Sequence, residues 1–156
     1  CKFKIGDGAA KITKFDQQAF DLRAISPDEA FPKFWEHLKW ADHIIMHNGL
    51  RFDIYLLKGY AEYMGEDWSF IFDKVIDTKS VAQGIKLGRP FDSKNDDWME
   101  YQYKMANDRT KGIKTNLTSL GKEFGISHDY DNLHNAIVDL QLNLKVWNKL
   151  KYQLEK

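Results

Sequence analysis

Two short segments of the chain each place a histidine and an aspartate at a fixed spacing among apolar residues. The first runs from His47 to Asp53, with the sequence HNGLRFD, and the second runs from His134 to Asp139, with the sequence HNAIVD. A carboxylate among apolar neighbours is unfavourable unless it is paired or bound to a cation, and two carboxylates that face one cleft repel each other. A divalent cation removes this repulsion, and carboxylate oxygens suit Mg²⁺ or Mn²⁺. The two segments therefore predict a metal site that activates water and cleaves phosphodiesters.

The position of His134 constrains the element that carries it. His134 precedes Asp139 by five residues, about one and a half helical turns, so the two side chains would diverge in a regular helix. If both serve one site, His134 must lie on a loop or in the first helical turn, and Asp131 and Asn132 are candidate helix caps. From that position the imidazole ring could take a proton from an attacking water.

Predicted strands and helices alternate around these two segments. Apolar runs predict strands at residues 43–46 and 70–76, and turn signals at Gly6-Asp7-Gly8 predict strand pieces across residues 3–20. Ser26 is the expected cap of the first helix, and Thr115 or Asn116 is the expected cap of the fourth. This alternation predicts a layered α/β domain with a mixed sheet. The predicted helices cover about residues 27–38, 52–64, 78–85, 117–124 and 133–154.

Residues 86–114 interrupt this alternation. They are rich in Lys, Asp, Asn and aromatic residues, with breakers at Arg89-Pro90 and Lys111-Gly112, and they predict an irregular insertion with a helical turn near residues 98–105. Two interpretations stay open: a solvated loop whose acidic residues offset the charge, or a flap that grips the phosphates of a single strand and stacks its bases. The basic residues of this segment are Lys86, Arg89, Lys104, Arg109, Lys111 and Lys114.

Composition limits the possible functions. With 156 residues, 43% of them hydrophobic, the chain is long enough for one folded domain. Its formal net charge is zero, so binding to nucleic acid must come from a local patch rather than from global charge. Cys1 is the single cysteine, which excludes an intramolecular disulfide and fits an intracellular location. No apolar run reaches the length that spans a membrane, so no membrane partner is expected.

Both segments match the motifs of a known enzyme family. HNGLRFD has the form His-Asn-spacer-aromatic-Asp, and HNAIVD has the form His-x-Ala-x-x-Asp. Between them, Ile76-Asp77-Thr78 resembles the family's strand-ending Asp-Thr, and residues 117–126 resemble the helix that leads into the last motif. Over most of residues 24–150 the chain resembles the DnaQ-like (DEDDh) 3′→5′ exonucleases, which have a ribonuclease H-like fold.

The resemblance implies a fold and a set of site residues. The fold would be a ribonuclease H-like mixed sheet flanked by helices, in a single exonuclease-like domain of residues 1–156 with the insertion at about 86–114. By the family's pattern, Asp53 and Asp139 would bind two divalent ions, Mg²⁺ or Mn²⁺, and His134 would be the general base. The expected substrate contacts are Asn48, Phe52 and Arg51, the last of which is either a phosphate contact or a surface residue.

Two features depart from the family pattern. The spacer between Asn48 and Phe52 is one residue longer than the commonest form, a variation found in some mammalian-type DNA exonucleases and some phage polymerase exonuclease domains. The first motif, Asp-x-Glu on an opening strand, is absent: Asp28-Glu29 begins a helix, and residues 97–100 lie in the insertion. We therefore expect that the N-terminal strand is missing or truncated and that its residues lie upstream of Cys1. A naturally inactive relative is the alternative.

The predicted activity is that of a metal-dependent 3′→5′ exonuclease, which releases nucleoside monophosphates from single-stranded or frayed nucleic acid ends, with DNA favoured. Its expected partners are the 3′ ends of single-stranded DNA or RNA, and a DNA polymerase. Because two expected ligands are missing, little activity is expected from these 156 residues alone. One alternative is an exonuclease-like domain that binds nucleic acid or a polymerase without cutting. Another is an unrelated α/β interaction domain in which these residues are caps and surface groups.

Overall fold

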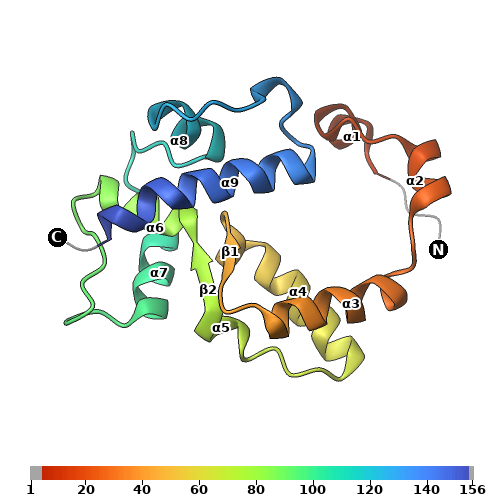
Figure 1. Cartoon of the computed structure of the whole chain (residues 1–156), viewed down its shortest axis with the longest axis horizontal. Helices are drawn as coiled ribbons and strands as arrows, with labels where there is room; N and C mark the ends of the chain where they lie inside the picture. The colour runs from red at the N-terminus through yellow and green to blue at the C-terminus, as the bar shows by residue number, and fades with distance from the viewer. Residues whose placement is uncertain (1–4, 155–156) are drawn as a thin grey trace.

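Two short parallel strands lie at the centre of this α/β structure (Figure 1). The computed structural model describes residues 5–154, in which strand β1 (Ile44–Met46) pairs with strand β2 (Val75–Asp77) and Ile45 lies opposite Ile76. Every residue of β2 is buried, as expected for a parallel strand that is covered on both faces. The sequence predicts a mixed sheet, whereas the sheet formed by the described residues consists of these two parallel strands.

Helices surround the sheet, and their predicted caps are found at α3 and α8. The side-chain oxygens of Ser26 and Asn116 accept hydrogen bonds from the N–H groups of Glu29 (3.2 Å) and Ser119 (2.9 Å), respectively. Gly65 ends α4 with a φ of 70°, a conformation that glycine adopts without strain. In chain order the helices are α1 (Asp7–Thr13), α2 (Gln17–Arg23), α3 (Pro27–Trp40), α4 (Asp53–Met64), α5 (Ile71–Lys74), α6 (Thr78–Lys86), α7 (Trp98–Asn107), α8 (Leu117–Glu123) and α9 (Ala136–Leu150), with 3₁₀ turns at Gly49–Arg51, Tyr130–Asn132 and Lys151–Gln153.

The opening segment is helical, so the prediction of strand pieces across residues 3–20 is wrong for its described part. The Asp16 side chain caps α2 by accepting a hydrogen bond from the N–H of Ala19 at 3.0 Å. This cap and the helix-forming Gln, Ala and Leu residues of α2 outweigh a short apolar pattern. The part of the prediction that falls on residues 1–4 lies outside the described residues. Helices α1 and α2 lie apart from the sheet in Figure 1. The amino group of Lys14, which follows α1, donates a hydrogen bond to the Asp131 carbonyl at 3.0 Å.

The strand predicted at residues 70–76 begins later than expected. Helix α5 takes up most of that range, and β2 starts at Val75. The turn before α5 is fixed by Asp67, whose carboxyl oxygens accept hydrogen bonds from the N–H and the hydroxyl group of Ser69, each at 2.9 Å. Such local side-chain bonds compete with extended backbone, and an apolar run does not reveal them.

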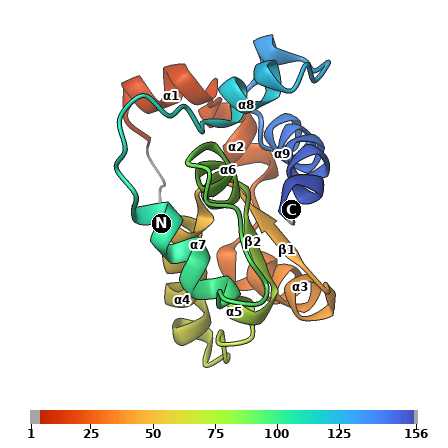
Figure 2. The ribbon, with the colours of Figure 1, turned by 90° about the vertical axis from the view of Figure 1, so that its left-hand side faces the viewer.

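Helix α7 lies in the predicted insertion and covers the outer edge of β2 (Figures 1 and 2). Gln102 is buried; its Nε2 donates to the Val75 carbonyl at 3.1 Å, and its Oε1 accepts from the N–H of Asp77 at 2.6 Å. Trp98 Nε1 donates to the same Val75 carbonyl at 3.1 Å. The helical turn predicted near residues 98–105 is therefore confirmed, and it satisfies backbone groups that an open strand edge would leave unpaired.

Two clusters of buried hydrophobic residues pack against the sheet. The first comes from α3, α4, α5, the two strands and the 3₁₀ turn Gly49–Arg51, and it includes Trp35, Leu50 and Val75. The second comes from α6, α8 and α9, and includes Leu120 and Leu142. Because burial of such side chains is the main favourable term in folding, these clusters fix how α4 and α9 approach the ends of the strands.

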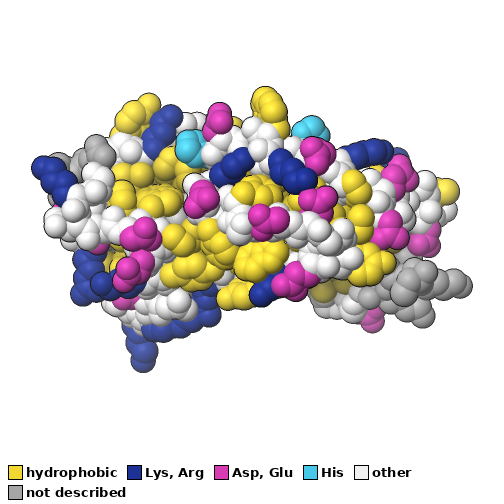
Figure 3. All heavy atoms as spheres, turned by 90° about the horizontal axis from the view of Figure 1, so that it is seen from below, with side chains coloured by type: hydrophobic (Ala, Val, Ile, Leu, Met, Phe, Trp, Pro, Cys, Tyr) yellow, Lys and Arg dark blue, Asp and Glu magenta, His cyan; other side chains and the backbone are white. Residues whose placement is uncertain are grey.

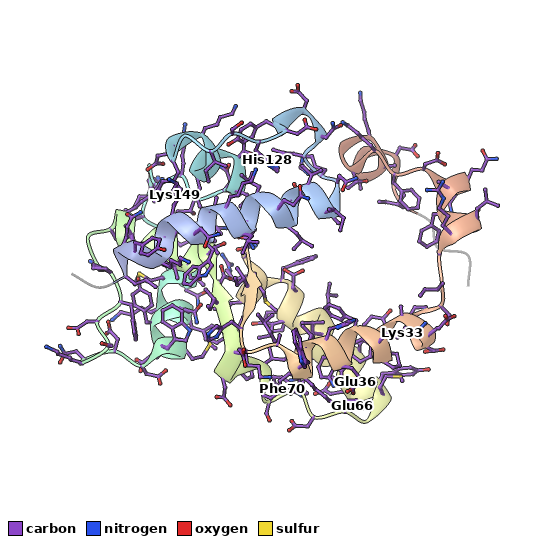
Figure 4. All side chains as sticks on the ribbon, in the orientation of Figure 1. Lys33, Glu36, Glu66, Phe70, His128 and Lys149 are labelled. Carbon is purple, nitrogen blue, oxygen red and sulfur yellow. The ribbon has the colours of Figure 1, made fainter. Side chains whose placement is uncertain are left out.

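The surface combines ion pairs with exposed hydrophobic groups. Lys39 forms ion pairs with Glu36 (3.2 Å) and Glu66 (2.8 Å), the two acidic residues labelled near α3 in Figure 4. Figure 3 shows patches of hydrophobic side chains interspersed with charged ones on the face seen from below. In the described part of the chain, no helix is long and apolar enough to cross a membrane.

Candidate functional site

One cavity brings together the histidines and aspartates of both motif segments. His47 and Asp53 reach it from the end of β1 and the start of α4, and His134 and Asp139 reach it from the loop before α9 and from α9 itself. Its volume is about 840 Å³. The rest of its lining is largely apolar and includes Phe34, Leu38, Ile44, Leu56, Leu57 and Leu140.

A buried carboxyl group at the end of β2 holds the first motif segment in place. Asp77 is fully buried, and its side-chain oxygens accept hydrogen bonds from the backbone N–H groups of Asn48 and Leu50, both at 3.0 Å. The same carboxyl group accepts from the N–H groups of Lys79 (3.0 Å) and Ser80 (3.3 Å), and so caps α6. One side chain therefore fixes the loop that leads to Asp53. Sequence reasoning matched Asp77 to a family motif but gave it no role in the site.

A hydrogen-bonded chain ties α9 to the ends of both strands. His47 Nδ1 lies 2.9 Å from Thr78 Oγ1, and Thr78 Oγ1 lies 2.6 Å from Asn143 Oδ1 and 3.0 Å from the Met46 carbonyl. Asn143 is buried on α9, four residues after Asp139, and residues at this spacing share a helix face. The contact from Asn143 to Thr78 therefore turns Asp139 toward the cavity. Sequence reasoning missed Thr78 and Asn143 as site residues, because their relation is spatial.

The imidazole ring of His47 is neutral in this hydrogen-bonded arrangement. Desolvation by burial is the largest cause that lowers the pKa of its imidazole, to about 4; a hydrogen bond to the Thr115 backbone and the charge of Asp77 oppose this only in part. At neutral pH the ring therefore carries no charge, and its role is to link Thr78 to the loop that contains Thr115.

The lowered pKa of His47 predicts a loss of stability in acid. As the pH falls from 6.5 toward 4, the unfolded chain binds a proton that the folded chain does not, so the free energy of unfolding decreases by roughly 3 kcal/mol from this group. Between pH 7 and pH 4.5, the decrease in the free energy of unfolding, measured by urea denaturation, should be about 2 kcal/mol smaller in His47→Gln than in the wild type. His43→Gln, at an exposed neighbouring position, is the control, and identical pH profiles for both variants would contradict the assignment.

Asp53 and Asp139 occupy different environments. Asp53 is the first residue of α4 and is exposed; partial desolvation, as the largest cause, and the nearby charge of Asp77 raise the pKa of its carboxyl group above the ordinary value. A nearby cation would favour the ionised form of this group. Asp139 is half-buried, and its Oδ1 accepts a hydrogen bond from the N–H of His134 at 3.2 Å.

His134 lies on the loop before α9, as its spacing from Asp139 requires. Its φ of 74° is left-handed, a conformation in which histidine is enriched among residues other than glycine, and its side chain is exposed. The cap of α9 is Asn135, whose Oδ1 accepts from the N–H of Ile137 at 3.1 Å. The predicted caps Asp131 and Asn132 are wrong, because both lie in a separate 3₁₀ turn, and the helix begins at residue 136 rather than 133.

The expected substrate contacts lie outside the cavity lining. Asn48 has a left-handed φ of 65°, and its Oδ1 accepts a hydrogen bond from Lys79 Nζ at 3.0 Å. Arg51 and Phe52 are exposed next to Asp53, with Phe52 62% exposed. All three residues lie in the segment that leads to Asp53. None of them lines the cavity that holds the two aspartates.

The two aspartates are a partial fit to a metal site. Within residues 5–154, no group of three or more His, Cys, Asp or Glu side chains is placed to hold a metal ion. Asp53 and Asp139 nevertheless face one cavity from two elements and offer the oxygen ligands that Mg²⁺ and Mn²⁺ prefer. A complete site would need ligands in addition to these two.

No known protein family, curated protein or solved structure matches this chain.

Proposed function

We propose that this chain is part of a metal-dependent 3′→5′ exonuclease with a ribonuclease H-like fold. Its substrate would be single-stranded or frayed nucleic acid, with DNA favoured, and its product a nucleoside monophosphate. The observation that carries the proposal is that Asp53, His134 and Asp139, from segments far apart in the sequence, line one cavity at the end of a parallel strand. The parallel pairing of β1 and β2, with α9 packed against β1, is compatible with that fold.

Each residue has a defined task in this proposal. Asp53 and Asp139 would hold divalent ions, Mg²⁺ or Mn²⁺, which supply Lewis-acid stabilisation of the charge that develops on the phosphate oxygens. His134, exposed on its loop, takes a proton from the attacking water at a ring nitrogen. The water oxygen bonds to phosphorus as the bond from phosphorus to the 3′ oxygen of the preceding nucleotide breaks. Asp77 keeps the loop of Asn48 in place, so that Asp53 stays at the cavity.

One observation favours a second candidate, an exonuclease-like domain that binds nucleic acid or a polymerase without cutting. Within the described residues, the cavity holds two carboxylates and lacks a group of three metal-ligating side chains. A domain that had lost catalysis could keep the cavity and its hydrogen-bonded frame while losing the remaining ligands.

A digest of labelled oligonucleotides separates these candidates. The full-length protein is incubated with 5′-labelled single-stranded DNA or RNA and Mg²⁺ or Mn²⁺, beside His134→Ala and the control His128→Ala, at a histidine outside the cavity. We expect a ladder that shortens from the 3′ end, slowed by about 10²- to 10⁴-fold in His134→Ala and unchanged in His128→Ala. Binding without any shortening by the full-length wild type would support the non-cutting domain instead.

A further inference from the structure

A second cavity adjoins the candidate site and is lined by basic side chains. It has a volume of about 410 Å³, and Lys79, Arg109 and Lys114 are its cationic residues. Asn116 lines both cavities, and Thr115, whose backbone is hydrogen-bonded to His47, lines the second. The two cavities therefore meet at Asn116. We call the second cavity the basic pocket.

The cations of the basic pocket are not neutralised by acidic partners. No carboxylate in residues 5–154 lies within 4 Å of the charged groups of Lys79, Arg109 or Lys114, whereas Lys39 and Lys86 elsewhere form ion pairs. Two of these charged groups, those of Lys79 and Arg109, donate hydrogen bonds to neutral oxygens. Lys79 Nζ donates to Asn48 Oδ1 at 3.0 Å, and Arg109 Nη1 donates to the Ala106 carbonyl at 3.5 Å.

The acidic residue in the lining, Asp108, is already engaged. Its Oδ1 accepts hydrogen bonds from Gln83 Nε2 (3.2 Å) and from the N–H of Thr110 (2.8 Å). These hydrogen bonds, with that of Thr110 as the largest cause, lower the pKa of the Asp108 carboxyl group. Three cations against one carboxylate leave the lining with a formal excess of positive charge. The pocket is also anchored, since the Lys114 carbonyl accepts a hydrogen bond from Lys86 Nζ at 2.7 Å.

We propose that the basic pocket binds a backbone phosphate of the same single strand whose 3′ end lies in the cavity of Asp53 and Asp139. This inference rests on the proposed function, because an exonuclease would bind a nucleic acid strand in the first cavity, next to Asn116. Lysine and arginine contacts to phosphate fix the register of a strand without reading its sequence. Because the chain has no net charge, a local cationic site of this kind must supply the attraction that global charge does not.

Binding can be measured apart from cleavage. The probe is a fluorescein-labelled oligothymidylate, titrated by fluorescence anisotropy with the full-length protein in EDTA at several salt concentrations. The test variant is Arg109→Gln/Lys114→Gln. The control is Arg23→Gln/Lys33→Gln, which removes the same charge from α2 and α3, far from the pocket. We expect at least tenfold weaker binding for the test variant and a salt slope lower by about 0.7, which corresponds to the loss of one phosphate contact. The control should match the wild type.

The outcomes separate the pocket from the enzyme. If the test variant binds with the affinity and salt slope of the control, the basic pocket is not a phosphate site, even where the wild type cleaves DNA in Mn²⁺. If the test variant loses binding and the wild type cleaves nothing, the phosphate site stands and the exonuclease proposal falls. Competition by polyglutamate as strong as that by unlabelled oligothymidylate would overturn the assignment to nucleic acid, and circular dichroism of both variants shows that they are folded.

Discussion

Replacing Asp77 by alanine is expected to lower the free energy of unfolding by about 3 to 5 kcal/mol. The carboxyl group of Asp77 is fully buried and accepts hydrogen bonds from four backbone N–H groups, which lie at the loop after β1 and at the start of α6. Alanine leaves the N–H groups of Leu50 and Ser80 buried without an acceptor, and those of Asn48 and Lys79 part-buried. Each unsatisfied buried group costs about 1 to 3 kcal/mol. Urea denaturation followed by circular dichroism measures the loss.

Two further variants make the result specific to these hydrogen bonds. Asp77→Asn keeps one oxygen acceptor but turns an N–H₂ group toward a donor, so its destabilisation should fall between those of the wild type and the alanine variant. Asp73→Ala removes an exposed carboxyl group from the preceding helix and should change stability by less than about 0.5 kcal/mol. An alanine variant of Asp77 as stable as that of Asp73 would mean that the carboxyl group does not hold the loop.

Replacing Asp139 by alanine is expected to abolish cleavage while the fold is kept. The loss should be about 10³-fold or more in the full-length protein, since the side chain is proposed to hold the catalytic cation. The cost in stability is small, because the carboxyl group of Asp139 accepts its hydrogen bond from the N–H of His134, which lies on an exposed loop. Removing a half-buried charge can even stabilise the chain slightly.

Thermal melts with and without Mn²⁺ test the same side chain independently of activity. The wild type should gain stability with added Mn²⁺, since a ligand that binds the folded state stabilises it, and Asp139→Ala should gain less. Asp131→Ala, at an exposed position upstream of the cavity, should behave as the wild type in both assays. Unfolding of Asp139→Ala seen by circular dichroism would contradict the metal-site proposal and indicate a structural role.

The sequence predicts most of the elements that carry their own local signals. The caps at Ser26 and Asn116 mark where α3 and α8 begin, and the apolar run before His47 marks β1. The errors fall where a single polar side chain sets the local structure: Asp16 caps a helix in the opening segment, and Asp67 fixes the turn before α5. Both effects depend on a single hydrogen-bonding residue, which periodicity does not detect.

For the candidate site, the sequence predicts the residues of each motif but not the frame that aligns them. Asp53, His134 and Asp139 line one cavity, and their roles in catalysis stay predictions. The link from Thr78 to Asn143 spans 65 residues, and a single sequence carries no sign of such a pairing. The sequence placed Arg109 and Lys114 in a possible phosphate-binding flap, but it did not show that Lys79, from the preceding helix, lines the same pocket.

The side chain of Gln102 makes the segment between α6 and α8 difficult to remove. Its amide offers one donor and one acceptor to β2, as the peptide group of an adjacent strand would, so a helix here stands in for a missing neighbour. A loop graft that shortened residues 87–114 would strip this surrogate from the sheet and leave the Val75 carbonyl and the Asp77 N–H unpaired. What reads in the sequence as an insertion is thus an integral part of the scaffold that orients Asp77.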